Sequence, residues 1–260
     1  MEKRLSALQP LKDNPAVSGI FSDIDGTISP IAEHPDEARV ADSAKKTIAR
    51  LAPKYGLFCL VTGRDIDRAT RMVGGKKLAY IGSHGLEIYL DQYYECLPEA
   101  ESYLAVVPDV AGYLRARLER DGVVVERKRL AIGVHYRQAK NKPLARERIL
   151  ETIEPLLSRF RLRSMQAREA IELRPDVPAN KGSAVRSLLE RRSLAAVAYF
   201  GDDTTDIAGF EAMEHARQEG RFAAKIAVES AEAPEELLER ADILLESVDQ
   251  VLEVFSWLAE

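Results

Sequence analysis

The chain has 260 residues, enough for one large domain or two small ones, and 46% of them are hydrophobic, enough to form a core. Its formal net charge of -5 argues against nucleic acid as a partner, because a phosphate backbone favours a basic face. The N-terminus shows no apolar signal core, and no apolar run approaches the roughly 18 residues of a membrane span. We therefore expect a cytoplasmic protein with no membrane partner.

Short apolar runs alternate with amphipathic stretches in the first and last thirds of the chain, and each run ends in a polar turn. The runs expected to be strands are 17–22, 57–61, 78–81 and 195–200, and the stretches expected to be helices include 37–51 and 181–192. This alternation predicts a Rossmann-like α/β core, a doubly wound parallel sheet with helices on both faces. Such sheets bind ligands outside the carboxyl ends of their strands, where the polar turns lie.

The middle of the chain has a different pattern. Two pairs of β-rich segments, 123–128 with 130–137 and 160–166 with 170–174, flank a helical stretch at 143–159. Adjacent strands that meet in hairpins indicate an α+β module. We therefore predict a core formed by residues 1–86 and 176–260, with an α+β cap domain inserted at 87–175.

Acidic side chains cluster after two of the predicted strands. Asp23 and Asp25 follow the first strand, and Asp202, Asp203 and Asp206 follow the last. Carboxylates this close repel one another, more so when buried, and a cation such as Mg²⁺, which prefers oxygen ligands, removes the repulsion. Asp-Gly is also a common turn dipeptide, and aspartate often caps a helix, so either cluster alone is a weak signal.

Two further segments offer contacts to an anion. Thr62 supplies a hydroxyl and Gly63 an unhindered backbone N–H at a strand-to-helix turn, where amides favour anions. Lys181 begins a helix just after the inserted module returns to the core, which places its charge near the same site, although most lysines are solvated at the surface. An acidic chain that binds a phosphate needs such local positive charge.

Taken in order, four segments resemble the motifs of the haloacid dehalogenase superfamily of phosphohydrolases. These segments are Asp23-Ile24-Asp25-Gly26-Thr27, Thr62, Lys181 and Gly201-Asp202-Asp203. The resemblance implies that Asp23 is the nucleophile and Asp25 the general acid/base, and that Thr62 and Lys181 hold the phosphoryl oxygens. It also implies a Mg²⁺ ion held by Asp23, Asp25 and Asp202.

Over nearly its whole length, the chain is similar to trehalose-phosphate phosphatases. The matching stretches are 25–31, 82–85, 125–128, 135–137, 172–175, 180–182 and 201–206. The resemblance implies two groups of substrate-binding residues, one on the core and one on the cap. The core group is Gly63, Arg64, His84 and Gly85, and the cap group is Glu126, Lys128, Arg137 and Glu172. Paired acids and bases suit sugar hydroxyls because they form charge-assisted hydrogen bonds.

The resemblance leads us to expect Mg²⁺-dependent hydrolysis of trehalose 6-phosphate through an aspartyl-phosphate. Ile207 departs from the family pattern, which has a glutamate after the Thr-Asp pair, and this change could alter magnesium affinity. One alternative is a phosphatase for another sugar phosphate, such as sucrose phosphate or a glycosyl-phosphoglycerate. Another is a non-catalytic module that binds a phosphosugar and regulates a trehalose-phosphate synthase. Whether the chain is an enzyme or such a module, this synthase is a candidate partner.

Overall fold

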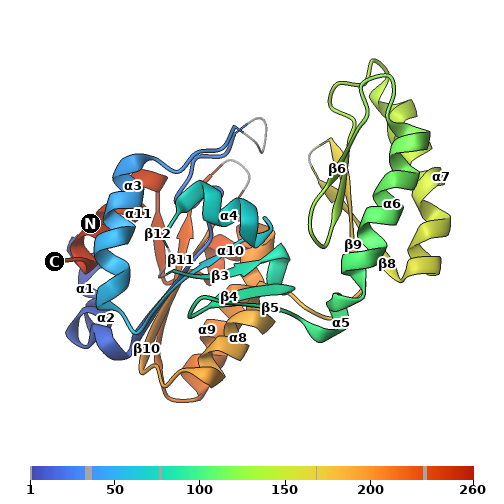
Figure 1. The fold of residues 1–260 in the computed structure, drawn as a ribbon. Helices are drawn as coiled ribbons and strands as arrows, with labels where there is room; N and C mark the ends of the chain where they lie inside the picture. Colours follow the sequence, from blue (N-terminus) through green and yellow to red (C-terminus); the bar gives the residue numbers. More distant parts are fainter. Residues whose placement is uncertain (1, 33–36, 76–77, 168, 231–232) are drawn as a thin grey trace. The chain divides into compact units, whose positions relative to one another are not determined.

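The structure is a computed structural model that describes residues 2–32, 37–75, 78–167, 169–230 and 233–260. The chain divides into two compact units (Figure 1). The core unit comprises Met1–Glu95 and Ala179–Glu260, and the cap unit comprises Cys96–Pro178. None of the helices in these described ranges is long and apolar enough to cross a membrane.

The core unit is built on an eight-stranded sheet with the order β12-β11-β10-β1-β2-β3-β4-β5. Its strands are β1 (Ser18–Ser22), β2 (Leu57–Val61), β3 (Ala79–Gly82), β4 (Glu87–Leu90), β5 (Tyr93–Cys96), β10 (Ala196–Gly201), β11 (Phe222–Val228) and β12 (Ile243–Leu245). The six strands from β12 to β3 are parallel, whereas β4 is antiparallel to β3. Because β1 lies between β2 and β10, the strand order reverses there, and this switch point is where open α/β sheets bind ligands.

Helices cover both faces of this sheet, which confirms the predicted doubly wound core. On one face the buried cluster draws on α2 (Gln9–Asp13), α3 (Asp42–Leu51), α4 (Ile66–Val73) and α11 (Val248–Leu258), and Leu5 of α1 (Glu2–Ser6) packs against it. On the other face the cluster draws on α8 (Lys181–Arg191), α9 (Ile207–Gln218) and α10 (Glu235–Arg240). The two neighbours of β1, β2 and β10, are almost wholly apolar because both of their sides are buried.

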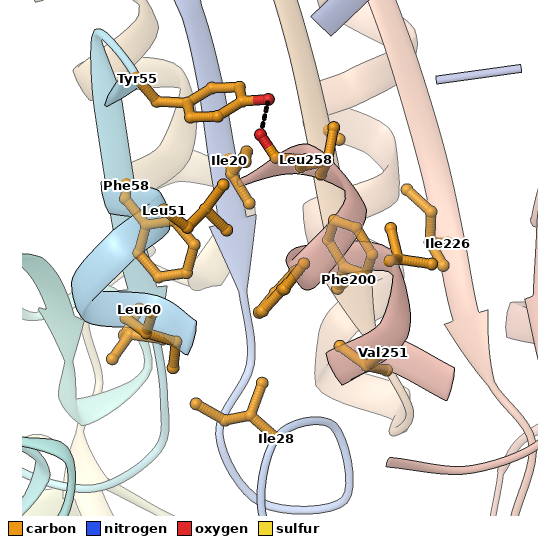
Figure 2. Packing of buried hydrophobic residues seen from close by; sticks show 14 of the residues in the cluster. Ile20, Ile28, Leu51, Tyr55, Phe58, Leu60, Phe200, Ile226, Val251 and Leu258 are labelled. Carbon is orange, nitrogen blue, oxygen red and sulfur yellow. Dashed lines mark hydrogen bonds between the residues drawn. The ribbon is translucent and has the colours of Figure 1, made fainter. Parts of the chain in front are cut away.

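Aromatic rings fix α11 against the sheet (Figure 2). Phe255 of α11 makes edge-to-face contacts with Phe58 of β2 and Phe200 of β10, with ring centroids 5.6 and 5.1 Å apart. The hydroxyl of Tyr55 donates a hydrogen bond to the carbonyl of Leu258 at 3.2 Å, close to the end of the same helix. Edge-to-face pairs add to the stability gained from burial alone. This packing holds β1, β2 and β10 in the alignment that their carboxyl ends require.

The cap unit is an antiparallel four-stranded sheet with two long helices. Its strands are β6 (Val124–Arg127), β7 (Ile132–His135), β8 (Leu162–Ala167) and β9 (Ala170–Pro175), in the order β6-β7-β9-β8. Its helices are α5 (Pro98–Glu101), α6 (Tyr103–Leu118) and α7 (Lys142–Phe160). The two expected hairpins, β6–β7 and β8–β9, and the helix between them are therefore present.

Both domain boundaries and one helix start differ from those expected, and residues 176–178, predicted for the core, lie in the cap unit. Residues 87–95 lie in the core unit rather than in the insertion, because β4 pairs with β3 and β5 with β4. The helix expected at 37–51 begins only at Asp42. Ala38 and Val40 are buried and alternate with exposed neighbours, which is the pattern of an extended segment that lays every second side chain on the core.

Candidate active site

The acidic ends of β1 and β10 come together. The N–H of Asp23 donates to the carbonyl of Phe200 at 2.9 Å, which continues the β1–β10 ladder to the end of β1. Carboxylate oxygens of Asp23, Asp202 and Asp206 lie within 4.8 Å of one another, and all three residues are buried. Two separate sequence clusters thus form one carboxylate group, called here the acidic cluster (Asp23, Asp202 and Asp206).

Lys181, the first residue of α8, is paired with this cluster. Its Nζ lies 3.0 Å from Oδ1 of Asp23 and 2.7 Å from Oδ1 of Asp206, and its side chain is only 2% exposed. Burial alone would lower the pKa of this amine, but Asp206 and Asp23 outweigh burial and raise its pKa well above the ordinary value. Lys181 is therefore a fixed positive charge in contact with the predicted nucleophile.

The sequence placed Asp206 in the second acidic cluster, with a helix cap as its alternative role, and gave it no site role of its own. Its Oδ1 accepts hydrogen bonds from Lys181 and from the hydroxyl of Tyr199, each at 2.7 Å. Its Oδ2 accepts from the backbone N–H groups of Asp202 and Asp203, each at 3.1 Å. Asp203 is the helix cap, since its carboxylate accepts from the N–H groups of Thr205 and Asp206. The Asp-x-x-Asp spacing of this reciprocal cap is the signal that could have identified Asp206.

One lysine does not balance the acidic cluster. Burial, together with the neighbouring carboxylates, raises the pKa of Asp23 well above its ordinary value even though Lys181 opposes this. Burial, Asp206 and Asp203 raise the pKa of Asp202 to about 7, against a 3.1 Å hydrogen bond from the hydroxyl of Thr27. The site therefore holds more negative charge than it can stabilise alone. An all-oxygen donor set with this excess charge fits a divalent cation.

Asp25 lies outside the acidic cluster and is bound by Arg64. Nε and Nη2 of Arg64 donate to the two carboxylate oxygens of Asp25 at 2.6 and 2.8 Å, a bidentate pair. The Asp25 side chain is 35% exposed, so it can reach a group that enters from solvent. Gly26, with φ of 86°, passes so close to Asp202 that a Cβ would lie 1.9 Å from its Oδ2. A contribution of Asp25 to metal binding through its backbone carbonyl stays a prediction.

The predicted anion contacts form two adjoining turns. The phosphate turn (residues 62–64) follows β2, and the β3 turn (Ser83–Gly85) follows β3. A Cβ on Gly63 would lie 2.2 Å from Nε2 of His84, so the imidazole covers that glycine. A Cβ on Gly85 would lie 2.3 Å from the carbonyl of Asn180, so the β3 turn also packs on the segment that begins α8. The residues predicted from motifs after β2 and β3 thus meet in space.

On the cap sheet, three of the four predicted residues gather around a glycine. Glu126, Gly133 and Glu172 are register partners across β6, β7 and β9. Lys128 forms an ion pair with Glu172. Gly133 has no side chain, and the imidazole of His135 lies over it, since a Cβ there would be 2.9 Å from Nε2 of His135.

Two cap residues that the sequence reading did not select complete this group. Arg174 pairs with Glu172, and Nε2 of His135 lies 2.9 Å from Oε2 of Glu126. Burial raises the pKa of Glu172, but Lys128 and Arg174 outweigh burial and leave its pKa below the ordinary value. Arg174 lies two positions after Glu172, and His135 lies two positions after the central glycine. Alternate residues of a strand share one face of the sheet, so this spacing is the signal that could have identified both.

Arg137, the fourth predicted cap residue, lies two residues beyond His135. Its Nε is 3.4 Å from Oε2 of Glu169, in the segment that joins β8 to β9. It lies in the turn that follows β7, and its role toward a substrate stays a prediction.

Comparison with known sequences places these motifs in a family context. A sequence model described as trehalose-phosphatase matches residues 21–239. A trehalose-phosphate phosphatase of Mycolicibacterium paratuberculosis is 38% identical over 204 residues, which are 75% of this chain and 51% of that protein. That of Mycobacterium tuberculosis is 37% identical over 202 residues, 74% of this chain and 50% of that protein. The chain spans about half the length of the curated relatives it matches.

Solved structures share the architecture over most of the chain. A trehalose-6-phosphate phosphatase related protein is 26% identical, with a TM-score of 0.76 over 93% of this chain and 96% of that one. The C-terminal domain of the Candida albicans trehalose-6-phosphate phosphatase gives 0.74 at 23% identity, over 98% and 96%. The C-terminal domain of the Candida albicans trehalose synthase regulatory protein gives 0.71 at 14% identity, over 97% of each chain. The last two likenesses concern the fold alone.

Proposed function

Because the chain belongs to the trehalose-phosphatase family, we propose that it hydrolyses trehalose 6-phosphate to trehalose and inorganic phosphate with Mg²⁺ as cofactor. The observation that carries the proposal is the buried Asp23–Lys181 pair beside Asp202, with Asp25 two residues away and partly exposed. The carboxylate of Asp23 is shielded from water, whereas the carboxylate of Asp25 can exchange protons with it. A nucleophile and an acid/base need those two different environments.

The acidic cluster would hold the divalent cation. Asp23 and Asp202 supply carboxylate oxygens, Asp206 lies beside them, and the backbone carbonyl of Asp25 is a further proposed ligand. The bound ion would supply positive charge to the phosphoryl oxygens and to the ionised form of Asp23. Among the divalent ions that accept oxygen ligands, Mg²⁺ suits a site with few protein ligands and a substrate phosphate.

In the first step, a carboxylate oxygen of Asp23 attacks phosphorus opposite the sugar oxygen. The new bond joins that oxygen to phosphorus, and the bond between phosphorus and the sugar oxygen breaks. Asp25 donates its proton to the departing oxygen, so the sugar leaves as an alcohol. Lys181, Thr62 and the N–H of Gly63 stabilise the charge on the remaining phosphoryl oxygens.

In the second step, water hydrolyses the aspartyl-phosphate. Asp25, now ionised, takes a proton from the water as its oxygen bonds to phosphorus. The bond between phosphorus and Asp23 breaks, and the carboxylate of Asp23 is restored. Arg64 binds both oxygens of Asp25 in this structure and so orients the ionised carboxylate for the proton transfer from water.

The cap residues support a sugar phosphate as the substrate class. Glu126 and Glu172, which flank Gly133 across the sheet, and Lys128, which pairs with Glu172, offer acceptors and donors of the kind that bind sugar hydroxyls. Trehalose 6-phosphate is favoured over sucrose phosphate or a glycosyl-phosphoglycerate by the family match. A phosphate-release panel with these three substrates tests that choice, and a preference for either alternative would overturn it.

A regulatory module that binds a phosphosugar without hydrolysing it is the alternative from another functional class. A regulatory protein of Candida albicans has the same fold, so the fold alone does not separate the two classes. The intact Asp23–Lys181 and Asp25–Arg64 pairs favour an enzyme, because binding alone needs no nucleophile and no acid. Release of phosphate with Mg²⁺, abolished by EDTA and restored by added Mg²⁺, is the expected result. A trehalose-phosphate synthase remains a candidate partner in either case.

We expect Asp25→Asn to slow sugar phosphates more than aryl phosphates. The amide keeps the backbone carbonyl but has no carboxyl proton to give, and an alkoxide leaving group depends on that proton far more than a phenolate does. The loss should be roughly 10²–10⁴-fold for trehalose 6-phosphate, the range typical of general acid catalysis. Comparing kcat on trehalose 6-phosphate and p-nitrophenyl phosphate measures it. Equal losses on both substrates would contradict the acid role.

We expect Glu126→Ala to lower kcat/KM for trehalose 6-phosphate by roughly 10–100-fold, since a hydrogen bond to a charged group contributes about 1.5–3 kcal/mol. Activity toward p-nitrophenyl phosphate, which has no sugar, should change little. Val124→Ala, on the same strand and 45% exposed, is the matched control and should leave both substrates unaffected. Glu126 is a cleaner choice than Glu172, whose removal would leave the charges of Lys128 and Arg174 unpaired. Parallel losses on both substrates would indicate a structural role.

A further inference from the structure

Glu87, the first residue of β4, carries a carboxyl group that is 0% exposed. Its Oε2 accepts hydrogen bonds from the hydroxyl of Ser83 at 2.9 Å and from the backbone N–H of Ile66 at 3.2 Å. Its Oε1 accepts from the hydroxyl of Tyr94 at 2.9 Å. Burying a carboxyl group costs stability unless hydrogen bonds compensate for its lost hydration. The proposed chemical steps do not use Glu87, so its burial calls for another explanation.

Two of these donors connect Glu87 to the two turns of the active site. Ile66 begins α4, the helix that the phosphate turn leads into, and Ser83 is the first residue of the β3 turn. Glu87 also lies directly beneath these turns, because a Cβ on Gly82 would lie 3.0 Å from its Oε2 and 3.1 Å from the carbonyl of Arg64. A single carboxyl oxygen thus joins the segments that follow β2 and β3.

The β3 turn needs to be held because its backbone is strained. Ser83 and His84 have φ values of 48° and 55°, in the left-handed region that non-glycine residues rarely occupy. Such residues cost stability and persist only where the surroundings enforce them. The Ser83 hydroxyl bond to Glu87 is one restraint. Backbone bonds from Ser83 to Arg64 at 2.8 Å and from His84 to Thr62 at 3.1 Å are others.

We propose that Glu87 is a positioning residue: it fastens the strained β3 turn to the start of α4, into which the phosphate turn leads, and so keeps Gly63 and the covering His84 ring in place for the phosphoryl group. The inference rests on the proposed function, which assigns those turns to phosphoryl binding. It differs from a purely structural role because it concerns the alignment of two turns and not the stability of the sheet. Loss of Glu87 should therefore weaken the binding of any phosphoryl group, whatever that group is attached to.

Glu87→Met and Ser83→Ala test the proposal with two readouts, inhibition by inorganic phosphate and hydrolysis of p-nitrophenyl phosphate. The methionine has no oxygen to accept from Ser83 and Ile66, and the alanine removes the hydroxyl that restrains the turn. For both variants we expect Ki for phosphate to rise by roughly 10–100-fold, as expected when a buried hydrogen bond is lost. kcat/KM for p-nitrophenyl phosphate and for trehalose 6-phosphate should fall by the same factor as each other.

Two controls separate positioning from stability. Tyr94→Phe removes the bond to the other carboxyl oxygen from β5 and should change Ki less than about threefold, because neither turn is released. Val254→Ala, in the buried core on α11, should lower Tm without changing Ki. Unchanged Ki values in Glu87→Met and Ser83→Ala, or a rise in Ki in Val254→Ala at equal loss of Tm, would overturn the inference. A wild-type protein with no phosphatase activity would instead overturn the proposed function.

Discussion

Asp23→Asn is expected to lower turnover by at least roughly 10⁴-fold while leaving the fold intact, a loss in the range seen when a covalent nucleophile is removed. The amide cannot form the acyl phosphate, yet its oxygen can still accept the hydrogen bond that Lys181 donates at 3.0 Å. Phosphate release from trehalose 6-phosphate measures the loss. Trapping of labelled phosphate on the protein, present in the wild type and absent in the variant, ties that loss to the covalent step.

The same substitution should leave thermal stability in EDTA unchanged or increase it. The pKa of Asp23 is raised in the fold, so its ionised form is disfavoured there. Its ionisation therefore lowers the free energy of unfolding, and the loss grows as pH rises above the pKa that Asp23 has in the unfolded chain. An uncharged amide avoids that penalty at neutral pH. Asp42→Asn, with a side chain that is 91% exposed, is the control and should change neither activity nor Tm. Turnover within tenfold of wild type, in protein shown by mass spectrometry to retain the amide, would contradict the nucleophile assignment.

The parts of the fold that the sequence predicted well are those set by local pattern. The strand expected at 57–61 has those bounds in the structure, because five buried apolar residues are followed at once by the polar phosphate turn. The hairpins of the cap were predicted for the same reason. In each case the apolar pattern and the turn residues lie within about ten residues of each other in sequence, so the element can be predicted without any distant contact.

The parts that were missed depend on contacts far along the chain or on unfavourable local signals. β4 was placed in the insertion because its pairing with β3 and β5 belongs to the sheet, not to its own pattern. The long helix α6 was not assigned, and it carries Pro108 in its interior, a residue that normally marks the end of a helix. Asp206 was named in the acidic cluster, but its contact to Lys181 was not predicted, because it spans 25 positions of sequence. Local motifs locate the strand ends, whereas the partners across the site come only from the assembled sheet.

Lys181→Met is expected to abolish activity and to destabilise the core together. Methionine is of similar length but carries no charge, so Asp23 and Asp206 lose the amine they share at 3.0 and 2.7 Å. Removing one partner of a buried ion pair costs about 3–5 kcal/mol, which should appear as a lower free energy of unfolding in urea with EDTA present. Phosphate release should fall by roughly 10³-fold or more, since the phosphoryl oxygens lose a positive charge in a buried site.

A second substitution separates the two effects. In Lys181→Met with Asp206→Asn, the introduced amide removes one of the uncompensated charges and can still bond to Tyr199 and to the N–H groups of Asp202 and Asp203. We expect the double variant to regain part of the lost stability, because an unpaired buried carboxylate is costlier than a neutral hydrogen-bonded group. Activity, assayed well below the lower Tm, should not return. If phosphate release recovered in step with stability, Lys181 would be a structural ion-pair partner and its assignment to the phosphoryl group would be wrong.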